Sequence, residues 1–150
     1  MPTNTFGPND NYNDLNSHFF PALIKKVHKL KFENNKILKL WGDGKAKREL
    51  IYVDDLANAC IFFMKKKTKH SLINIGTGKD FTIKYYANLI SKLILKNKKI
   101  LIKYDKSKPN GTRRKVMDVT LAKKYGWKSN ISLKEAILIT YNSFLKENNK

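Results

Sequence analysis

Apolar positions recur every three or four residues in several stretches of the chain, and short continuous apolar runs separate these stretches. The first helical pattern follows a loop-rich segment, residues 1–16, and predicts a helix from Ser17, its N-cap, to about Lys31. Similar patterns predict helices that are capped by Asp54 and by Thr82. This spacing is typical of amphipathic helices that bury one face against a core.

Two further helices are predicted near the end of the chain. The first ends at about Tyr125, and Gly126 is its expected C′ residue. Ser132 and Glu135 have the spacing of a capping box, which opens the last helix. The expected inner face of that helix is Ala136, Ile137, Ile139, Thr140 and Phe144. Residues from Glu147 onward are expected to be disordered.

Short apolar runs between these helices predict strands. The runs lie at residues 37–40, 49–53, 72–75 and 100–102. Glycines at 42 and 44 predict a turn between the first two strands. The alternation of short strands and helices over a length suited to one domain predicts an α/β fold.

The composition is strongly basic, with 31 Lys and Arg residues against 12 Asp and Glu residues and a formal charge of +19. A charge of this size is typical of proteins that bind nucleic acid or anionic membranes. However, only Arg48, Arg113 and Arg114 are arginine, the residue that forms bidentate contacts with phosphates and bases. Because the lysines are spread along the chain, we expect no specific nucleic-acid partner. A small basic binding protein without catalysis remains the alternative class.

The single cysteine favours a reducing compartment, and the lengths of the apolar runs argue against a membrane-spanning helix. Cys60, the only cysteine, lies in an apolar run and is expected to be buried and inert. No stretch reaches the roughly 18–20 apolar residues that a bilayer-spanning helix needs, and no signal peptide is recognisable. The expected location is the cytoplasm, without membrane contact.

His18 is the strongest candidate for chemistry. It lies where an Asn- and Pro-rich loop meets a helix, and loops on a rigid scaffold often carry catalytic groups. An ordinary histidine titrates near neutral pH and therefore suits proton transfer. A histidine that only caps or packs against the helix is the alternative. The pair Asp54 and Asp55 could be catalytic or metal-binding, but capping and favourable charge at a helix start explain it better, so no metal site is expected.

Several motifs resemble the extended short-chain dehydrogenase/reductases, which modify nucleotide sugars. The general motifs are PTNTFGP at 2–8, RELIYVDDLA at 48–57 and NIGTG at 74–78. Three more resemble the GDP-L-fucose synthases within that family: NSHFFPALI at 16–24, WGDG at 41–44 and KPNGTRRKVMD at 108–118. The resemblance covers nearly the whole chain. A related enzyme for another nucleotide sugar is the alternative within the family.

The resemblance implies a fold, a reaction and site residues. It implies residual strands of a Rossmann-type sheet, with residues 1–16 coming from the core near the nicotinamide and residues 17–150 forming mainly the substrate domain. The implied reaction epimerises GDP-4-keto-6-deoxy-D-mannose at C3 and C5 and then reduces it with NADPH, with His18 as the acid. The implied cofactor contacts are Pro2, Thr3, Asn4, Thr5 and His18. The implied substrate contacts are Lys26, Trp41, Arg48 and Asn110, where Asn110 replaces the family's usual Asp.

Other parts of such an enzyme are missing from the sequence. There is no Gly-x-x-Gly-x-x-Gly, and neither Tyr85 nor Tyr86 is followed by a lysine four residues later. The chain is therefore expected to be the C-terminal half of an enzyme, inactive alone, whose N-terminal dinucleotide-binding half is its partner. A fragment, a split gene product and a truncated reading frame are all compatible with this expectation. The resemblance also implies that the full-length enzyme is a homodimer.

Overall fold

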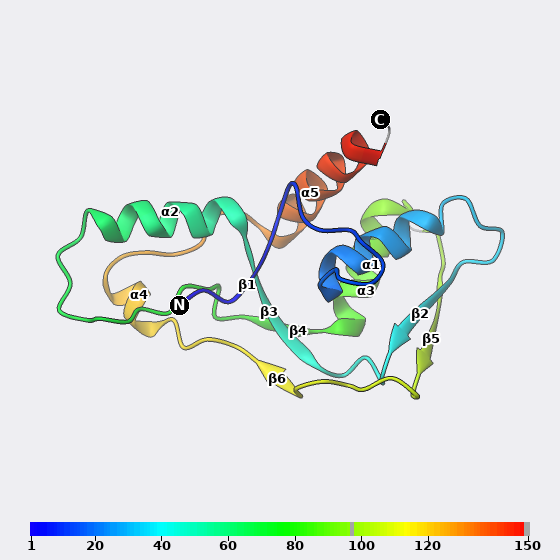
Figure 1. The fold of residues 1–150 in the computed structure, drawn as a ribbon, viewed down its shortest axis with the longest axis horizontal. Helices are drawn as coiled ribbons and strands as arrows, with labels where there is room; N and C mark the ends of the chain where they lie inside the picture. Colours follow the sequence, from blue (N-terminus) through cyan, green and yellow to red (C-terminus); the bar gives the residue numbers. More distant parts are fainter. Residues whose placement is uncertain (97, 149–150) are drawn as a thin grey trace. The chain divides into compact units, whose positions relative to one another are not determined.

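The computed structural model describes residues 1–96 and 98–148 and confirms the α/β fold (Figure 1). The described chain forms two compact units. The first unit contains Met1–Pro8, Arg48–Asp80 and the segment from Lys115 onward. The second contains Asn9–Lys47 and Phe81–Arg114.

A small sheet organises the first unit. Strand β1 (Asn4–Phe6) pairs in parallel with β3 (Lys47–Tyr52), and Thr5 lies opposite Ile51. The sheet has the order β1-β3-β4, where β4 is Asp80–Thr82, and the short β6 (Arg114–Lys115) also pairs with β3. Because β1 and β3 are parallel, their carboxyl ends meet at the same edge of the sheet.

Helices complete the core of the first unit. They are α2 (Val53–Met64), α4 (Thr120–Lys124) and α5 (Leu133–Asn148). One buried cluster joins the sheet to α2 and α4 through Ile51, Ala59, Ile75, Ala122 and Trp127. Removal of these apolar side chains from water supplies most of the stability of such a unit.

The second unit pairs two helices and two strands. Helix α1 (Phe19–Lys29) packs on α3 (Ile83–Ile94). Strand β2 (Ile37–Trp41) runs parallel to β5 (Leu101–Asp105), with register from Ile37 opposite Leu101 to Trp41 opposite Asp105. The rings of Phe20 and Tyr86 meet edge to face at 5.7 Å between the two helices.

Three predicted helix ends are confirmed. Thr82 caps α3, because its side-chain oxygen accepts the backbone N–H of Tyr85 at 3.0 Å. After α4, Gly126 has a φ of +92° and Trp127 donates its N–H to the carbonyl of Ala122, which is a Schellman motif. At the start of α5, Ser132 Oγ accepts the N–H of Glu135 at 3.3 Å.

Two predicted caps are wrong. Helix α1 begins one residue later than expected, so that His18 rather than Ser17 is its N-cap. Helix α2 is preceded by Tyr52 as N-cap, which places Asp54 and Asp55 inside the first turn. Their favourable position relative to the helix dipole is retained, but neither residue is the N-cap.

The predicted burial of two side chains is also wrong. Cys60 is exposed, because the neighbouring Ala59 is the residue of α2 that faces the core. On α5, Ile139 is 37% exposed and Tyr141 is buried in its place. The buried positions 136, 137, 140, 141 and 144 follow the helical repeat, and position 139 falls outside that stripe.

Two other segments differ from expectation. The predicted strand 72–75 is reduced to one parallel bridge between Ile75 and Pro2. Helix α5 continues through Glu147 to Asn148, so these residues are ordered helix rather than a disordered tail, and residues 149–150 lie outside the described part. No helix among the described residues has both the length and the apolar character needed to cross a bilayer.

Candidate functional site

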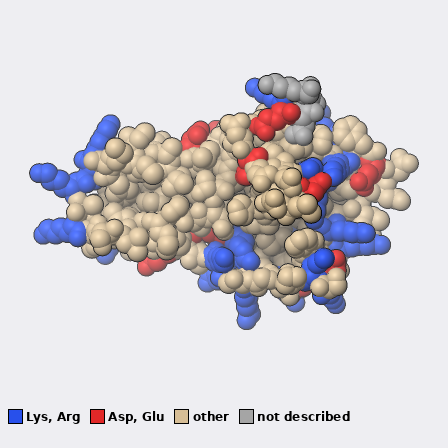
Figure 2. Space-filling model, in the orientation of Figure 1, with Lys and Arg blue, Asp and Glu red and all other residues tan. Residues whose placement is uncertain are grey.

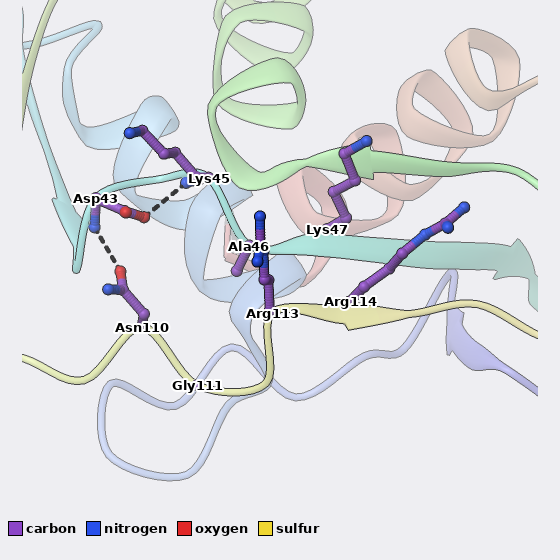
Figure 3. Close-up of a pocket in the computed structure, with 8 residues that line it drawn as sticks. All are labelled: Asp43, Lys45, Ala46, Lys47, Asn110, Gly111, Arg113 and Arg114. Atoms are coloured by element: carbon purple, nitrogen blue, oxygen red, sulfur yellow. Dashed lines mark hydrogen bonds between the residues drawn. The ribbon is translucent and has the colours of Figure 1, made fainter.

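A basic cavity of about 700 Å³ lies within the second unit (Figure 3). Two chain segments line it, one between β2 and β3 and the other following β5. The lining residues are Asp43, Lys45, Ala46, Lys47, Asn110, Gly111, Arg113 and Arg114. This volume lies within the range of small-molecule sites, roughly 300–1,000 Å³.

Three hydrogen bonds hold the two segments together. Gly42 donates its N–H to the carbonyl of Asp105 at 2.9 Å, and Lys47 donates to the carbonyl of Arg113 at 2.9 Å. Between them, Asp43 donates its N–H to Oδ1 of Asn110 at 2.7 Å. Gly42 has a φ of +67°, and a Cβ there would lie 2.1 Å from Asn110 Oδ1, so this turn requires glycine.

The charges of this cavity are one-sided. Two lysines and two arginines line it, and Asp43 is its only carboxylate. Asp43 Oδ1 accepts the backbone N–H of Lys45 at 2.9 Å, which fixes the carboxylate beside the turn. A second hollow of about 530 Å³ shares Asp43, Lys45 and Asn110 and adds Tyr104 and Lys106. The combined surface favours an anionic ligand.

An exposed aromatic ring lies at the end of β2. Trp41 is 62% exposed, and the ammonium groups of Lys26 and Lys108 lie 5.7 and 5.6 Å from its ring centroid. Partial burial lowers the pKa of Lys26, and the nearby carboxylate of Asp14 opposes that shift. A solvent-facing ring flanked by cations can stack on a planar ligand and also attract its negative charge.

His18 presents its side chain to solvent. Its backbone carbonyl accepts the N–H of Ala22 at 3.1 Å, but its imidazole makes no capping hydrogen bond. Asp10 lies within electrostatic reach: burial raises the pKa of that carboxyl, while the N–H of Asn11 and the charge of His18 lower it. Because the imidazole neither caps nor packs the helix, it is available to a ligand.

The predicted cofactor segment lies in the first unit. Thr3 Oγ1 and Asn4 Nδ2 both donate to the carbonyl of Glu49, at 3.5 and 3.1 Å, and Thr5 Oγ1 donates to the carbonyl of Thr3 at 3.3 Å. These side chains are therefore engaged within the protein. Pro2 forms the bridge to Ile75 described above. A ligand could still use the main-chain atoms of this segment and the side-chain oxygens that these bonds leave free to accept.

Glu49 is a buried carboxylate that the sequence interpretation did not single out. Its Oε1 accepts the N–H of Gly78 at 2.6 Å, and its Oε2 accepts the N–H of Met117 at 2.7 Å. The hydroxyl of Thr77 donates to the same Oε1 at 3.4 Å. A Cβ on Gly76 would lie 2.3 Å from this oxygen, which explains the glycine there. Glu49 therefore joins three segments of the first unit.

Asp55 also has a structural role. It is buried at the start of α2, and its two oxygens accept the N–H groups of Asn130 and Ile131 at 2.9 and 3.2 Å. Asp55 therefore anchors the loop that contains Asn130 and Ile131. Among the described residues, no cluster of three or more His, Cys, Asp or Glu side chains could hold a metal ion.

The structure brings some predicted site residues together. Trp41 lies beside Lys26, and Asn110 is fixed against the turn that follows Trp41. Lys47 lines the cavity, whereas Arg48 is the next residue of β3 and therefore points to the opposite side of the strand.

The sequence interpretation missed Lys45, Lys47 and Arg113 as members of a site. One signal was available, since two of the three arginines of the chain are adjacent and follow Asn110 and Gly111 directly. Lys45 and Lys47 gave no such signal, because most cations of the chain are lysines distributed over its surface (Figure 2).

Known proteins similar to this chain are nucleotide-sugar enzymes. GDP-L-fucose synthase of Escherichia coli (strain K12) is 38% identical over 159 residues, covering 100% of this chain and 49% of that protein. GDP-L-colitose synthase of Yersinia pseudotuberculosis is 39% identical over 150 residues, covering 99% of this chain and 48% of that protein. The chain therefore spans about half the length of these relatives.

Solved structures show the same fold. A GDP-mannoheptose C4 reductase from Campylobacter jejuni with NADP bound has a TM-score of 0.79 and 27% identity, covering 96% of this chain and 51% of that protein. The sequence model of the NAD dependent epimerase/dehydratase family matches residues 1–76, half of the chain. The parallel strands, the two units and these similarities lead to one conclusion: the chain belongs to the NAD dependent epimerase/dehydratase family.

Proposed function

We propose that this chain is the C-terminal, substrate-binding part of an NADPH-dependent enzyme that converts GDP-4-keto-6-deoxy-D-mannose to GDP-L-fucose. The observation that carries the proposal is the 38% identity to a GDP-L-fucose synthase across the whole chain. Residues 1–16 belong to the cofactor-binding core in this proposal, and residues 17–150 form mainly the substrate domain. An N-terminal dinucleotide-binding half completes the enzyme, which acts as a homodimer.

His18 is the acid in the proposed reaction. Protons at C3 and C5 are removed next to a ketone and returned on the opposite face, so a positioned group must deliver a proton to carbon. The imidazole of His18, the N-cap residue of α1, is exposed. It makes no capping hydrogen bond that would compete with this role.

The residues present fit only one end of the cofactor. NADPH supplies the hydride that reduces the C4 ketone. In the proposal, main-chain atoms of Pro2, Thr3, Asn4 and Thr5 pass the nicotinamide end, together with His18. The sequence has no glycine-rich strand-to-helix turn for the pyrophosphate of the dinucleotide, so the missing half must hold that group.

The remaining predicted residues bind the GDP-sugar. Trp41 offers an exposed ring, and Lys26 beside it offers a charge. Arg48 has a planar guanidinium group, which can donate two parallel hydrogen bonds to phosphate oxygens. Asn110 uses Oδ1 for the N–H of Asp43, which leaves its Nδ2 group to donate to a sugar hydroxyl. An aspartate at this position could accept but not donate such a bond.

The isolated chain should not oxidise NADPH, because its sequence has no glycine-rich strand-to-helix turn to hold the pyrophosphate of the dinucleotide. Adding the N-terminal half of the Escherichia coli relative, joined at Met1 or supplied in trans, should give NADPH oxidation that depends on GDP-4-keto-6-deoxy-D-mannose. Absorbance at 340 nm measures this reaction. Turnover by the isolated chain, or the absence of turnover with every GDP-4-keto sugar after complementation, would contradict the proposal.

Binding of a GDP-sugar should be visible in tryptophan fluorescence. The chain has two tryptophans: Trp41 is exposed, whereas Trp127 is buried in the core of the first unit. Titration with GDP-mannose should therefore change the Trp41 emission, and Trp41→Phe should abolish the change. UDP-glucose is the control ligand. An equal response to both sugar nucleotides would show that the site does not select guanine.

GDP-L-colitose synthesis is the second candidate, because the corresponding relative has nearly the same identity, 39%. Chromatography and mass spectrometry of the product of the complemented enzyme separate the two activities. The proposal for fucose requires that the product is GDP-L-fucose.

A further inference from the structure

We propose that the connection after α2 docks on the anionic lipid headgroups of a membrane surface. The docking surface consists of four lysines and the two apolar side chains that flank them: Lys65, Lys66, Lys67, Lys69, Met64 and Leu72. It contains no residue of the proposed reaction, so the inference does not depend on a particular sugar nucleotide. The expectation of no membrane contact rested on the lack of a spanning segment, and peripheral docking needs none.

The connection concentrates positive charge without a compensating carboxylate. Four of the five residues 65–69 are lysine, and residues 56–79 contain neither Asp nor Glu. Within the described part of the chain, none of these four ammonium groups forms an ion pair. Clusters of about four to eight cations are attracted to membranes that contain anionic lipids, because each cation near the surface adds to the binding free energy.

The apolar flanks of the lysine cluster are open to solvent. Met64, the last residue of α2, is 85% exposed, and Leu72 is 61% exposed. All residues from 64 to 72 are exposed, and Figure 2 shows Lys and Arg side chains projecting from the end of the first unit where this connection lies, at the left of Figure 1. A membrane surface offers both kinds of partner, negative headgroups and an apolar layer beneath them.

Contacts with Tyr125 hold the connection against the first unit. Thr68, which lies between the lysines, donates its hydroxyl hydrogen to the Tyr125 hydroxyl at 3.0 Å. The ring of Phe63, just before the connection, meets the ring of Tyr125 edge to face at 6.0 Å. A connection that is held in place before binding loses less conformational entropy when it docks.

A membrane fits the docking surface better than a nucleic acid does. No arginine lies between Arg48 and Arg113, so the cluster lacks the group that forms bidentate contacts with phosphates and bases. Phe62 and Phe63, the phenyl rings beside the cluster, are half-buried and therefore offer little surface on which a base could stack. Exposed aliphatic side chains, in contrast, gain free energy when they leave water for the lipid interface.

Co-sedimentation of the 150-residue chain with lipid vesicles tests the proposal. Vesicles of phosphatidylcholine with about 30% phosphatidylserine should bind the chain at about 0.15 M salt, whereas pure phosphatidylcholine vesicles should not. The triple variant Lys65→Gln/Lys66→Gln/Lys67→Gln should bind the mixed vesicles about tenfold more weakly or worse, because it loses three of the four cations of the docking surface.

Lys92→Gln/Lys128→Gln/Lys134→Gln is the charge-matched control. It removes three exposed lysines that are remote from the connection in sequence, and its affinity should stay within about threefold of the parent. Equal weakening in both triple variants would show that binding depends only on the net charge of the chain. That result, or no binding to the mixed vesicles, would overturn the proposal.

The apolar flanks are tested by Met64→Gln/Leu72→Gln, which should weaken binding to the mixed vesicles about three- to tenfold. The matched control is Leu15→Gln/Phe32→Gln in the second unit, where the two side chains are 91% and 77% exposed, and its binding should not change. Unchanged binding in the first variant would contradict insertion of Met64 and Leu72 and overturn the docking surface as defined.

Ser71→Lys provides a gain of affinity that misfolding cannot produce. It adds a cation at an exposed position of the connection and should tighten binding to the mixed vesicles about two- to fivefold. Unchanged or weaker binding would count against the docking surface. Duplex DNA is the competing ligand: tighter binding to DNA than to vesicles, lost in the Lys65→Gln/Lys66→Gln/Lys67→Gln variant, would assign the surface to nucleic acid and overturn the proposal.

Discussion

His18→Gln in the complemented enzyme should lower kcat by about 10²–10⁴-fold and leave the affinity for the GDP-sugar nearly unchanged. Glutamine keeps the approximate size and hydrogen-bonding capacity of histidine but cannot donate and regain a proton near neutral pH. Uptake of solvent deuterium at C3 and C5 of the sugar, measured by NMR or mass spectrometry, should fall in parallel with kcat.

His70→Gln is the matched control. His70 is an exposed histidine in the first unit, outside all the site residues described above, so the substitution should leave kcat and deuterium uptake unchanged. If His18→Gln raised KM alone, with kcat and deuterium uptake intact, His18 would be a binding residue and its assignment as acid would be wrong.

Arg48→Ala should show the opposite kinetic pattern. A hydrogen bond to a charged group contributes about 1.5–3 kcal/mol, so loss of a phosphate contact should weaken GDP-sugar binding while largely preserving turnover at saturation. The contrast between the two variants separates proton transfer from ligand binding within one enzyme.

Glu49→Gln should destabilise the first unit by about 2–3 kcal/mol, although it changes only one atom. The carboxylate accepts the N–H groups of Gly78 and Met117 with its two oxygens. A glutamine has one oxygen, so one buried N–H would face an NH₂ group and lose its acceptor. Urea denaturation monitored by fluorescence of Trp127, which is buried in the same unit, measures the loss.

Glu33→Gln removes the same charge at an exposed position and should change stability by less than about 0.5 kcal/mol. Equal unfolding midpoints for both variants would show that the bonds to Glu49 contribute little beyond charge.

The helices were largely predictable because their signals are local. The periodic apolar residues of α1 are buried in the structure, and Thr82 and Gly126 occupy the caps that their chemistry favours. The prediction of a helix end was wrong where either of two neighbouring residues can occupy the N-cap position. His18 took the N-cap position in place of Ser17, a shift of one residue, and helix ends commonly differ by one or two residues from the position that local signals indicate.

Burial was less predictable than helix type. An apolar run suggested that Cys60 is buried, but helix α2 turns by about 100° per residue and faces the core with Ala59 instead. The predicted strand 72–75 pairs at a single bridge, because strand formation depends on partners that are remote in sequence.

The sequence by itself determined the α/β class, most helices, the family motifs and the candidate residues His18, Trp41 and Asn110, because each depends on residue type and short-range spacing. The tertiary structure alone decided that Glu49 joins three segments and that Lys45 and Lys47 share a cavity with Arg113. The residues brought together are separated by up to 68 positions along the chain, and hydrogen bonds between distant segments, from backbone to backbone and from backbone to side chain, hold them in place. Short-range sequence patterns cannot predict contacts between segments that are so far apart along the chain.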